Sequence, residues 1–74
     1  MFVKNRRYTC LVDCMQASPV PGGTSEQEWV YVAQYETIQV VGDPEGGFVE
    51  IVLEDGTHAW LETDEFDYFE LEVD

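Results

Sequence analysis

The segment "GGFVEIVLEDGTHAWL" (46–61) decides the fold, because it holds two strand-forming runs on either side of a turn. The runs, 48–53 and 57–62, are rich in β-branched, aromatic and aliphatic residues, which is typical of half-buried strands. Between them, "EDG" (54–56) is typical of a turn, since Gly56 adopts a left-handed conformation without steric cost. The segment therefore predicts a β-hairpin.

The hairpin has two candidate registers, which differ in the side chains that share a face. A two-residue turn would set Glu50 opposite Leu61, so that a charge would face a core candidate. A three-residue loop with Gly56 in the left-handed conformation pairs Leu53 with Thr57 instead. A slip of one residue inverts every side chain, so the second register is preferred. It predicts an apolar face of Val49, Ile51, Leu53, Thr57, Ala59 and Leu61, and an outer face of Phe48, Glu50, Val52, His58, Trp60 and Glu62.

The rest of the chain alternates strand-forming runs with turns. The run 29–41 is too long for one straight strand, so we expect a bend near Gln34 and Tyr35. The stretch 14–28 carries two prolines and two glycines and is expected to be a long loop. Further elements are expected as a strand at 8–13, a turn at 42–47, a helical turn at 63–69 capped by Thr63, and a closing strand at 70–73.

Charge is the most unusual property of the composition. The 74 residues carry a formal net charge of −13, from 16 acidic side chains against the cations Lys4, Arg6 and Arg7. Such a surface repels phosphate groups, which argues against direct binding to nucleic acid or to anionic membranes. It attracts basic protein surfaces. A solvated acidic coat for solubility, or an adaptation to high salt, explains the composition equally well.

The cysteines and the first residues indicate a cellular compartment. Cys10 and Cys14 would lie about 13 Å apart along a strand, too far for a disulfide. We therefore expect reduced thiols and a reducing compartment. The opening "MFVKNRRY" lacks the apolar run of a secretory signal. Together these features predict a cytoplasmic protein.

The order of elements from residue 8 to 74 resembles the small barrel of the Src-homology-three superfamily. "CLVDC" (10–14) stands where that family has its Ala-Leu-Tyr-Asp-Tyr motif, and "ETIQVV" (36–41) resembles its second strand. "TDEFDYFELEV" (63–73) is similar to its helical turn and closing strand. The resemblance implies an all-β, five-stranded barrel with a long first loop and one helical turn before the last strand. Residues 1–7 then form a basic N-terminal tail.

The resemblance does not extend to the polyproline groove of the eukaryotic family. Val12 and Cys14 replace two groove aromatics, and the helical turn has no proline. Phe48 stands near the family's ligand-binding tryptophan. The short, acidic chain also resembles the small barrel proteins that bacteriophages encode, which would place it in the host cytoplasm.

Catalysis and metal binding find little support in the sequence. His58 is the only histidine, and it shares the outer face with Glu62, so an acid–base pair is conceivable. No nucleophile accompanies this pair, and we expect no enzymatic activity. Cys10, Cys14 and His58 give at most three soft ligands without a Cys-x-x-Cys pair, so no metal or cofactor is expected.

The C-terminal segment is the densest acidic cluster. Glu70, Glu72 and Asp74 alternate with Leu71 and Val73, and we expect the three acids on one solvent face. Like charges at this spacing lower stability, which favours a functional role, although protection of an edge strand explains part of it. The seven acids among the last 13 residues are Glu62, Asp64, Glu65, Asp67, Glu70, Glu72 and Asp74.

Phe48 and Trp60 are the candidate apolar contacts on the outer face of the hairpin. Glu50 and Glu62 would surround them, and aromatic anchors within a charged rim are typical of protein interfaces. A cage for a methylated cation is an alternative. The long loop 14–28 could instead cover both rings. Trp29, with Tyr31 and Tyr35, is interpreted as a core or loop-packing residue.

These features predict a small, monomeric binding module that docks on a basic surface of a larger protein and inhibits or modulates it. A protein that handles nucleic acid is the candidate partner. The acids would stand in for phosphates. The expected binding residues are Phe48, Trp60, Glu50, Glu62, Asp64, Glu65, Asp67, Glu70, Glu72 and Asp74. The alternative is a structural accessory barrel that oligomerises through its strand edges. Residues 1–7 would clamp a second, acidic patch or form a frayed terminus.

Overall fold

The computed structural model describes residues 1–20 and 29–73. The described residues form short strands and one short 3-10 helix, η1, so the prediction of an all-β fold is confirmed. The elements are β1 (Arg7–Cys10), β2 (Met15–Ala17), β3 (Val30–Val32), β4 (Thr37–Val40), β5 (Phe48–Leu53), β6 (His58–Glu62), η1 (Thr63–Tyr68) and β7 (Phe69–Leu71).

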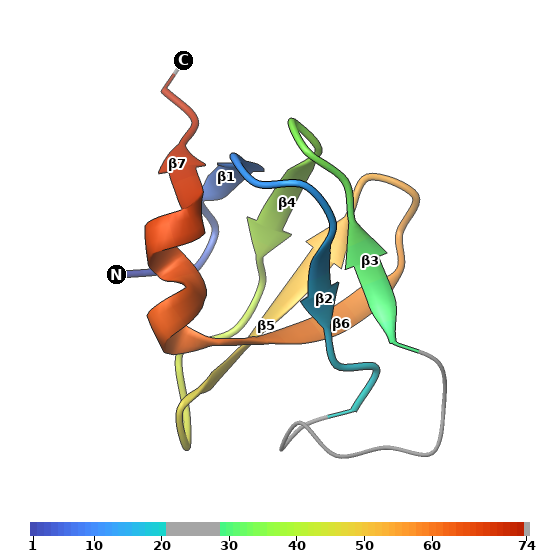
Figure 1. The fold of residues 1–74 in the computed structure, drawn as a ribbon. Helices are drawn as coiled ribbons and strands as arrows, with labels where there is room; N and C mark the ends of the chain where they lie inside the picture. Colours follow the sequence, from blue (N-terminus) through green and yellow to red (C-terminus); the bar gives the residue numbers. More distant parts are fainter. Residues whose placement is uncertain (21–28, 74) are drawn as a thin grey trace.

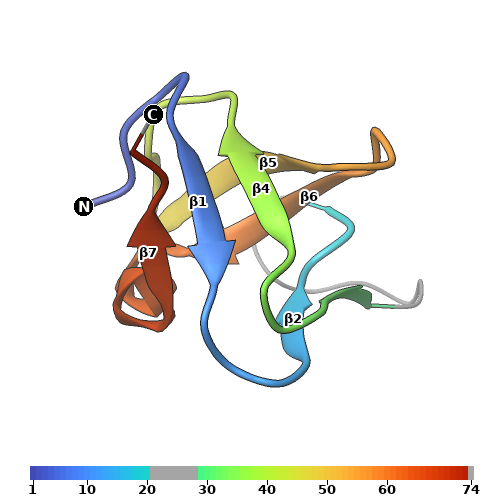
Figure 2. The same ribbon diagram turned by 90° about the horizontal axis from the view of Figure 1, so that it is seen from above.

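The strands make two antiparallel sheets (Figure 1). The larger sheet has the order β6-β5-β4-β1-β7, and the smaller consists of β2 and β3. Seen from above, β7, β1 and β4 lie side by side, with β5 and β6 crossing behind them (Figure 2). In the described part of the chain the two edge strands, β6 and β7, share no ladder, so the five-stranded sheet does not close into a barrel through hydrogen bonds.

The β5–β6 hairpin has the register that the apolar pattern favours. Val49 lies opposite Leu61 and Ile51 opposite Ala59. Gly56 has a φ of 90°, and the Leu53 N–H donates to the Thr57 carbonyl at 2.9 Å. The three-residue loop is therefore confirmed, and the aliphatic side chains of this face are buried while the opposite face is half-buried or exposed.

The stretch 29–41 bends where the sequence predicts. Tyr35 has a φ of 70°, and its N–H donates to the Cys10 carbonyl at 2.7 Å, so the turn between β3 and β4 rests on the end of β1. The prediction of an unbroken loop at 14–28 is wrong, because Met15–Ala17 pairs with Val30–Val32. The apolar residues of β2 are too few to stand out among its turn-forming neighbours. The part of this loop at 21–28 lies outside the described residues.

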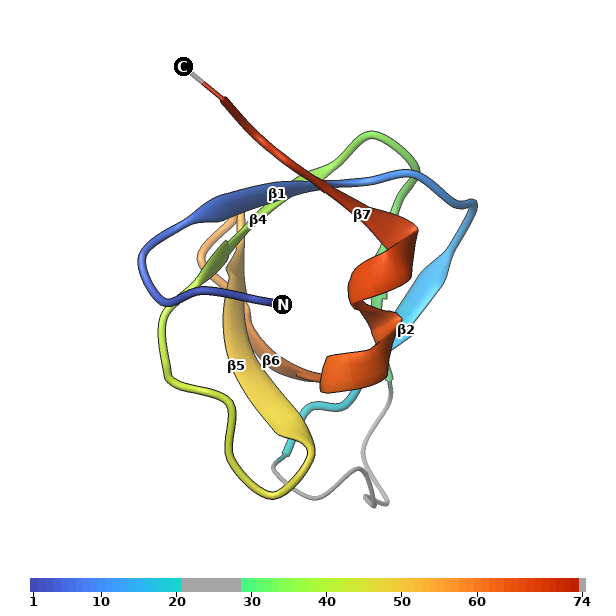
Figure 3. The same ribbon diagram turned by 90° about the vertical axis from the view of Figure 1, so that its left-hand side faces the viewer.

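The N-terminus packs into the core, so the interpretation of a frayed end is wrong. The Phe2 side chain is 2% exposed and lies edge-to-face with Tyr8 at 5.1 Å, Phe66 at 5.2 Å and Phe69 at 5.6 Å between ring centroids. The Val3 N–H donates to the Tyr8 hydroxyl at 2.8 Å. In Figure 3 the chain start projects within the ring of β1, β4, β5, β6 and η1, at one open end of the curved sheet.

The helix η1 begins at Thr63, and its N-cap lies one residue before the predicted cap. Glu62, not Thr63, is the N-cap residue of η1, and the Glu65 carboxylate accepts a hydrogen bond from the Glu62 N–H at 2.9 Å. This arrangement is one arm of a capping box, which satisfies a backbone donor at the helix start. The turn therefore ties Glu65 to the end of β6.

The two cysteines do not form a disulfide. Cys10 is buried and Cys14 is exposed, and both thiols are free, as the sequence predicts. Among the described residues no helix has the length and apolar character needed to cross a membrane.

We expect Phe2→Ala to lower the free energy of unfolding by about 3 kcal/mol or more, because a buried ring is lost and a cavity is left. In a domain of this size that loss is close to the whole net stability. Urea unfolding followed by circular dichroism measures it. Val3→Ala is the matched control, since Val3 is 50% exposed and such changes stay within about 0.5 kcal/mol. Equal midpoints for Phe2→Ala and the wild type would contradict the packing of the N-terminus.

Candidate protein-binding surface

Phe48 and Trp60 lie on the outer face of the β5–β6 hairpin, and both are half-buried. Glu62 is the cross-strand partner of Phe48, and Glu50 is that of Trp60. Cross-strand partners share one face of a sheet at about 5 Å between their Cβ atoms. Each aromatic ring therefore has a carboxylate beside it.

A concavity of about 300 Å³ opens on one side of these rings. The small sheet forms its far wall, because Ser18, just after β2, exchanges two backbone hydrogen bonds with Trp60 at 2.8 and 2.9 Å. The described part of the long loop thus borders the two rings and leaves them accessible from the concavity. The lining residues are Gln16, Ser18, Trp29, Phe48, Trp60, Glu62 and Glu65.

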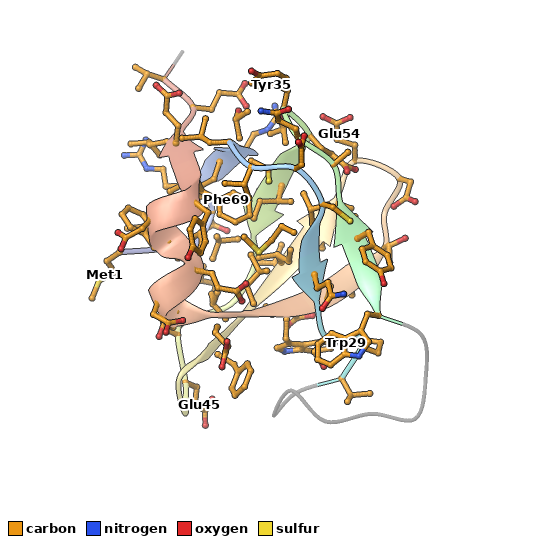
Figure 4. The ribbon with its side chains drawn as sticks, viewed as in Figure 1. Met1, Trp29, Tyr35, Glu45, Glu54 and Phe69 are labelled. Carbon is orange, nitrogen blue, oxygen red and sulfur yellow. The ribbon has the colours of Figure 1, made fainter. Side chains whose placement is uncertain are left out.

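A second concavity, of about 600 Å³, is lined by the same two rings. The turn between β4 and β5 contributes Asp43 and Glu45 to its lining. Phe48 and Trp60 thus line both concavities. In Figure 4, Trp29 and Glu45 lie at the lower end of the molecule, whereas Tyr35 and Glu54 lie at the upper end.

We call this region the aromatic–acidic surface. Among the described residues it combines three aromatic side chains with five carboxyl groups, and no described Lys or Arg lines either concavity. Carboxylates beside partly exposed rings suit a cationic partner, since the rings attract a cation through their π faces. The surface consists of Trp29, Phe48, Trp60, Asp43, Glu45, Glu50, Glu62 and Glu65.

Trp29, Asp43 and Glu45 belong to the surface but were not predicted from the sequence. Trp29 is 39% exposed and does not belong to the core, so its interpretation as a core residue is wrong. The alternative, packing on the long loop, involves positions 21–28, which lie outside the described residues. Pairing of β2 with β3 brings Trp29 beside the hairpin, and no local pattern signals that pairing. For the two acids a signal existed, because the turn "GDPEGG" (42–47) directly precedes Phe48.

His58 pairs with Glu50, whereas the sequence had offered Glu62 only as a candidate partner. The His58 Nδ1 lies 2.8 Å from a Glu50 carboxylate oxygen, and both side chains are partly exposed to solvent. The diagonal across the β5–β6 ladder brings them together, because Val52 is the direct partner of His58. Among the described residues no group of three or more His, Cys, Asp or Glu could hold a metal ion.

The predicted C-terminal acids do not all join the aromatic rings. Glu62 and Glu65 line a concavity with Trp60. Glu70 lies in β7 and Glu72 directly follows it, at the opposite edge of the five-stranded sheet (Figures 1 and 2). Of the remaining predicted site residues, Asp64 and Asp67 are exposed on η1, and Asp74 lies outside the described residues.

The environment of Glu65 perturbs the acidity of its carboxyl group. Burial raises the pKa of its side chain above the ordinary value of 4.5, and the negative charges of Glu62 and Asp64 act in the same direction. The hydrogen bond from the Glu62 N–H opposes this rise without cancelling it. Ionisation of Glu65 costs free energy because of burial and the neighbouring carboxylates. A cation bound beside it would lower this cost.

Comparisons of the chain with protein-family models, curated proteins and solved structures gave no significant match.

The raised pKa of Glu65 predicts a pH dependence of stability. Folded Glu65 holds its proton more tightly than the unfolded chain does, so the free energy of unfolding falls as pH rises from about 4.5 through the folded pKa. Asp55 acts in the opposite sense, because hydrogen bonds from Thr57 lower its pKa below 3.8. Its contribution is lost only as pH falls through that lower range.

We expect Glu65→Gln to raise the free energy of unfolding at neutral pH and to reduce its decline above about pH 4.5. Glutamine keeps an oxygen for the Glu62 N–H, so the cap survives. Urea unfolding at several pH values measures the effect. Glu54→Gln is the control, since it removes the same formal charge from an exposed side chain at the other end of the molecule. Identical pH profiles for both variants would contradict the special environment of Glu65.

Proposed function

We propose that this chain is a small protein-binding module that docks on a basic surface of a larger protein and inhibits or modulates it. The aromatic–acidic surface is the observation that carries the proposal. Aromatic side chains supply desolvated contact area, while carboxylates around them select a cationic partner and steer its approach. Interfaces commonly have this composition, with apolar anchors inside a polar rim.

The placement of the cations supports the same assignment. Lys4, Arg6 and Arg7 precede or begin β1, and Arg7 lies near Glu72 at the opposite sheet edge from Trp60. No described Lys or Arg therefore lies at the aromatic–acidic surface, where the His58 ring is the side-chain partner of Glu50. Carboxylates that stay unpaired within the protein gain most from a cationic partner, and this gain is screened by salt.

A protein that handles nucleic acid is the partner class we propose. Such proteins expose Lys and Arg side chains that bind phosphate groups. Carboxylates presented on a rigid sheet would occupy those side chains, and the partner could then not bind its nucleic acid. The formal net charge of −13 supports this mimicry.

We also propose that the fold is of the Src-homology-three type. The sheet order β6-β5-β4-β1-β7, the long excursion between β1 and β4, and the turn of η1 directly before β7 support this assignment. The bacteriophage origin that the resemblance implies stays a prediction.

A structural accessory role is the second candidate function. The free edge of β7 favours it, because unpaired strand edges join sheets of separate molecules. Light scattering of the purified chain distinguishes the two functions. A stable oligomer that persists when Glu70 and Glu72 are changed to glutamine supports the accessory role. A monomer supports the binding module.

We expect a short arginine-rich peptide to bind the aromatic–acidic surface and to change the tryptophan fluorescence, since Trp29 and Trp60 both line it. Affinity should fall as salt is added, because exposed charges are screened. Phe48→Ala keeps both tryptophans and should weaken binding about tenfold, or about 1.4 kcal/mol. The double variant Glu62→Gln and Glu65→Gln should weaken binding and reduce its salt dependence.

The matched control is the double variant Asp13→Asn and Glu54→Gln. It removes two formal charges from exposed side chains that line neither concavity, and should bind like the wild type. A peptide of the same length with glutamine in place of arginine should not bind. Equal loss of affinity in both double variants would mean that only net charge matters, and the assignment of the surface would then be wrong.

A further inference from the structure

β7 (Phe69–Leu71) is an open edge of the five-stranded sheet. It pairs with β1 on one side, and no described segment pairs with its other side. In Figures 1 and 2 it lies at the outer margin of the sheet, next to the chain end. An exposed strand edge is a template for another strand, because its backbone donors and acceptors already have strand geometry.

The ladder to β1 shows which backbone groups of β7 point outward. The Leu11 N–H donates to the Tyr68 carbonyl and the Glu72 N–H donates to the Arg7 carbonyl, both at 2.9 Å. Along an antiparallel strand, the backbone N–H and carbonyl of successive residues point alternately toward the paired strand and away from it. Leu71 therefore presents both its N–H and its carbonyl to the open side. The Phe69 N–H is already bound to the Phe66 carbonyl, which leaves the Phe69 carbonyl free on that side.

The side chains around this edge are acidic on one face and apolar on the other. Glu70 is exposed and Glu72 is half-buried. Leu71 is 42% exposed although it shares the core face with the buried Tyr8 across the ladder. An added strand would place its alternate side chains beside Glu70 and Glu72, and the intervening ones beside Leu71.

The carboxylates of this edge are incompletely neutralised. Arg7 Nε lies 3.8 Å from a Glu72 carboxylate oxygen, which is too long for a hydrogen bond. That oxygen is shielded from solvent and has no hydrogen-bond partner among the described residues. A shielded carboxylate oxygen without a partner costs free energy, and a cation brought in by a neighbouring strand would recover it.

A second copy of the chain is a poor occupant for the same reason. Pairing of two β7 strands would set acids of one copy beside acids of the other, and like charges on adjacent strands destabilise a sheet. The formal net charge of −13 on each copy adds a general repulsion.

We propose that the open edge of β7 binds an extended segment of a partner protein as an added strand, in which Lys or Arg alternates with apolar residues. The backbone of Leu71 supplies the hydrogen bonds, and Glu70 and Glu72 select the cations. The inference rests on the proposed function in one respect, that the partner is cationic, but it uses a different surface.

The probe is a short peptide in which lysine alternates with valine and threonine, added to the ¹⁵N-labelled chain. We expect the amide signal of Leu71 to shift and its hydrogen exchange to slow, because its N–H becomes hydrogen-bonded. Exchange of the Leu71 amide needs no variant, so an unchanged exchange rate in saturating peptide overturns the proposal outright.

Leu71→Pro tests the outward donor. Proline removes the N–H that faces the open side and leaves the ladder to β1 intact, which is where edge strands tolerate it. We expect affinity for the peptide to fall at least tenfold. Glu70→Gln with Glu72→Gln should weaken binding and flatten its salt dependence. Retention of full affinity in either variant overturns the proposal.

The control pair, Asp13→Asn with Glu54→Gln, removes two charges from exposed side chains that line neither concavity and lie outside β7. We expect it to leave peptide affinity unchanged. Asp43→Asn with Glu45→Gln, on the aromatic–acidic surface, distinguishes the two surfaces. Loss of binding in this second pair, with normal binding by Leu71→Pro, would place the peptide on the aromatic–acidic surface. The strand-addition inference would then be wrong while the proposed function would stand.

Discussion

The register of the β5–β6 hairpin is the constraint on which the rest of the structure depends. The left-handed conformation of Gly56 fixes a three-residue loop, and this sets Val49 opposite Leu61 and Ile51 opposite Ala59. Strand side chains alternate, so the same register that fills the core turns Phe48 and Trp60 outward together. One hairpin register thus determines both the core and the candidate surface. A mutation that shifted this register by one residue would disrupt both.

A cluster of aromatic rings stabilises the part of the fold that no strand pairing closes. The described sheet does not close between β6 and β7, which η1 connects along the chain. Phe2 packs against Tyr8, against Phe66 of η1 and against Phe69 of β7. Burial of a phenylalanine contributes about 1.5–3 kcal/mol, which is large beside the net stability of a domain of this size. This apolar packing offsets the repulsion that a formal net charge of −13 imposes on the folded state.

Most of the fold could be predicted from local sequence patterns. The errors arose where tertiary contacts determine the position of a residue. The hairpin register and the bend at Tyr35 follow from side-chain alternation and turn chemistry within a few residues. The burial of Phe2 was not predicted, because no residue near it in the sequence indicates its contacts with the distant Phe66 and Phe69. Neighbours in sequence also mislead: Glu62 and Glu72 belong to one acidic run, yet they end at opposite edges of the sheet.

That separation changes how the acidity could act. A single acidic patch would bind a partner through one contact whose strength salt readily screens. Two separate surfaces, one around Trp60 and one along β7, could act together only on a partner that reaches both edges of the sheet. The second contact would then be intramolecular, and its effective concentration would multiply affinities that are weak alone. A small chain with a core of modest stability would thereby bind tightly without a large interface.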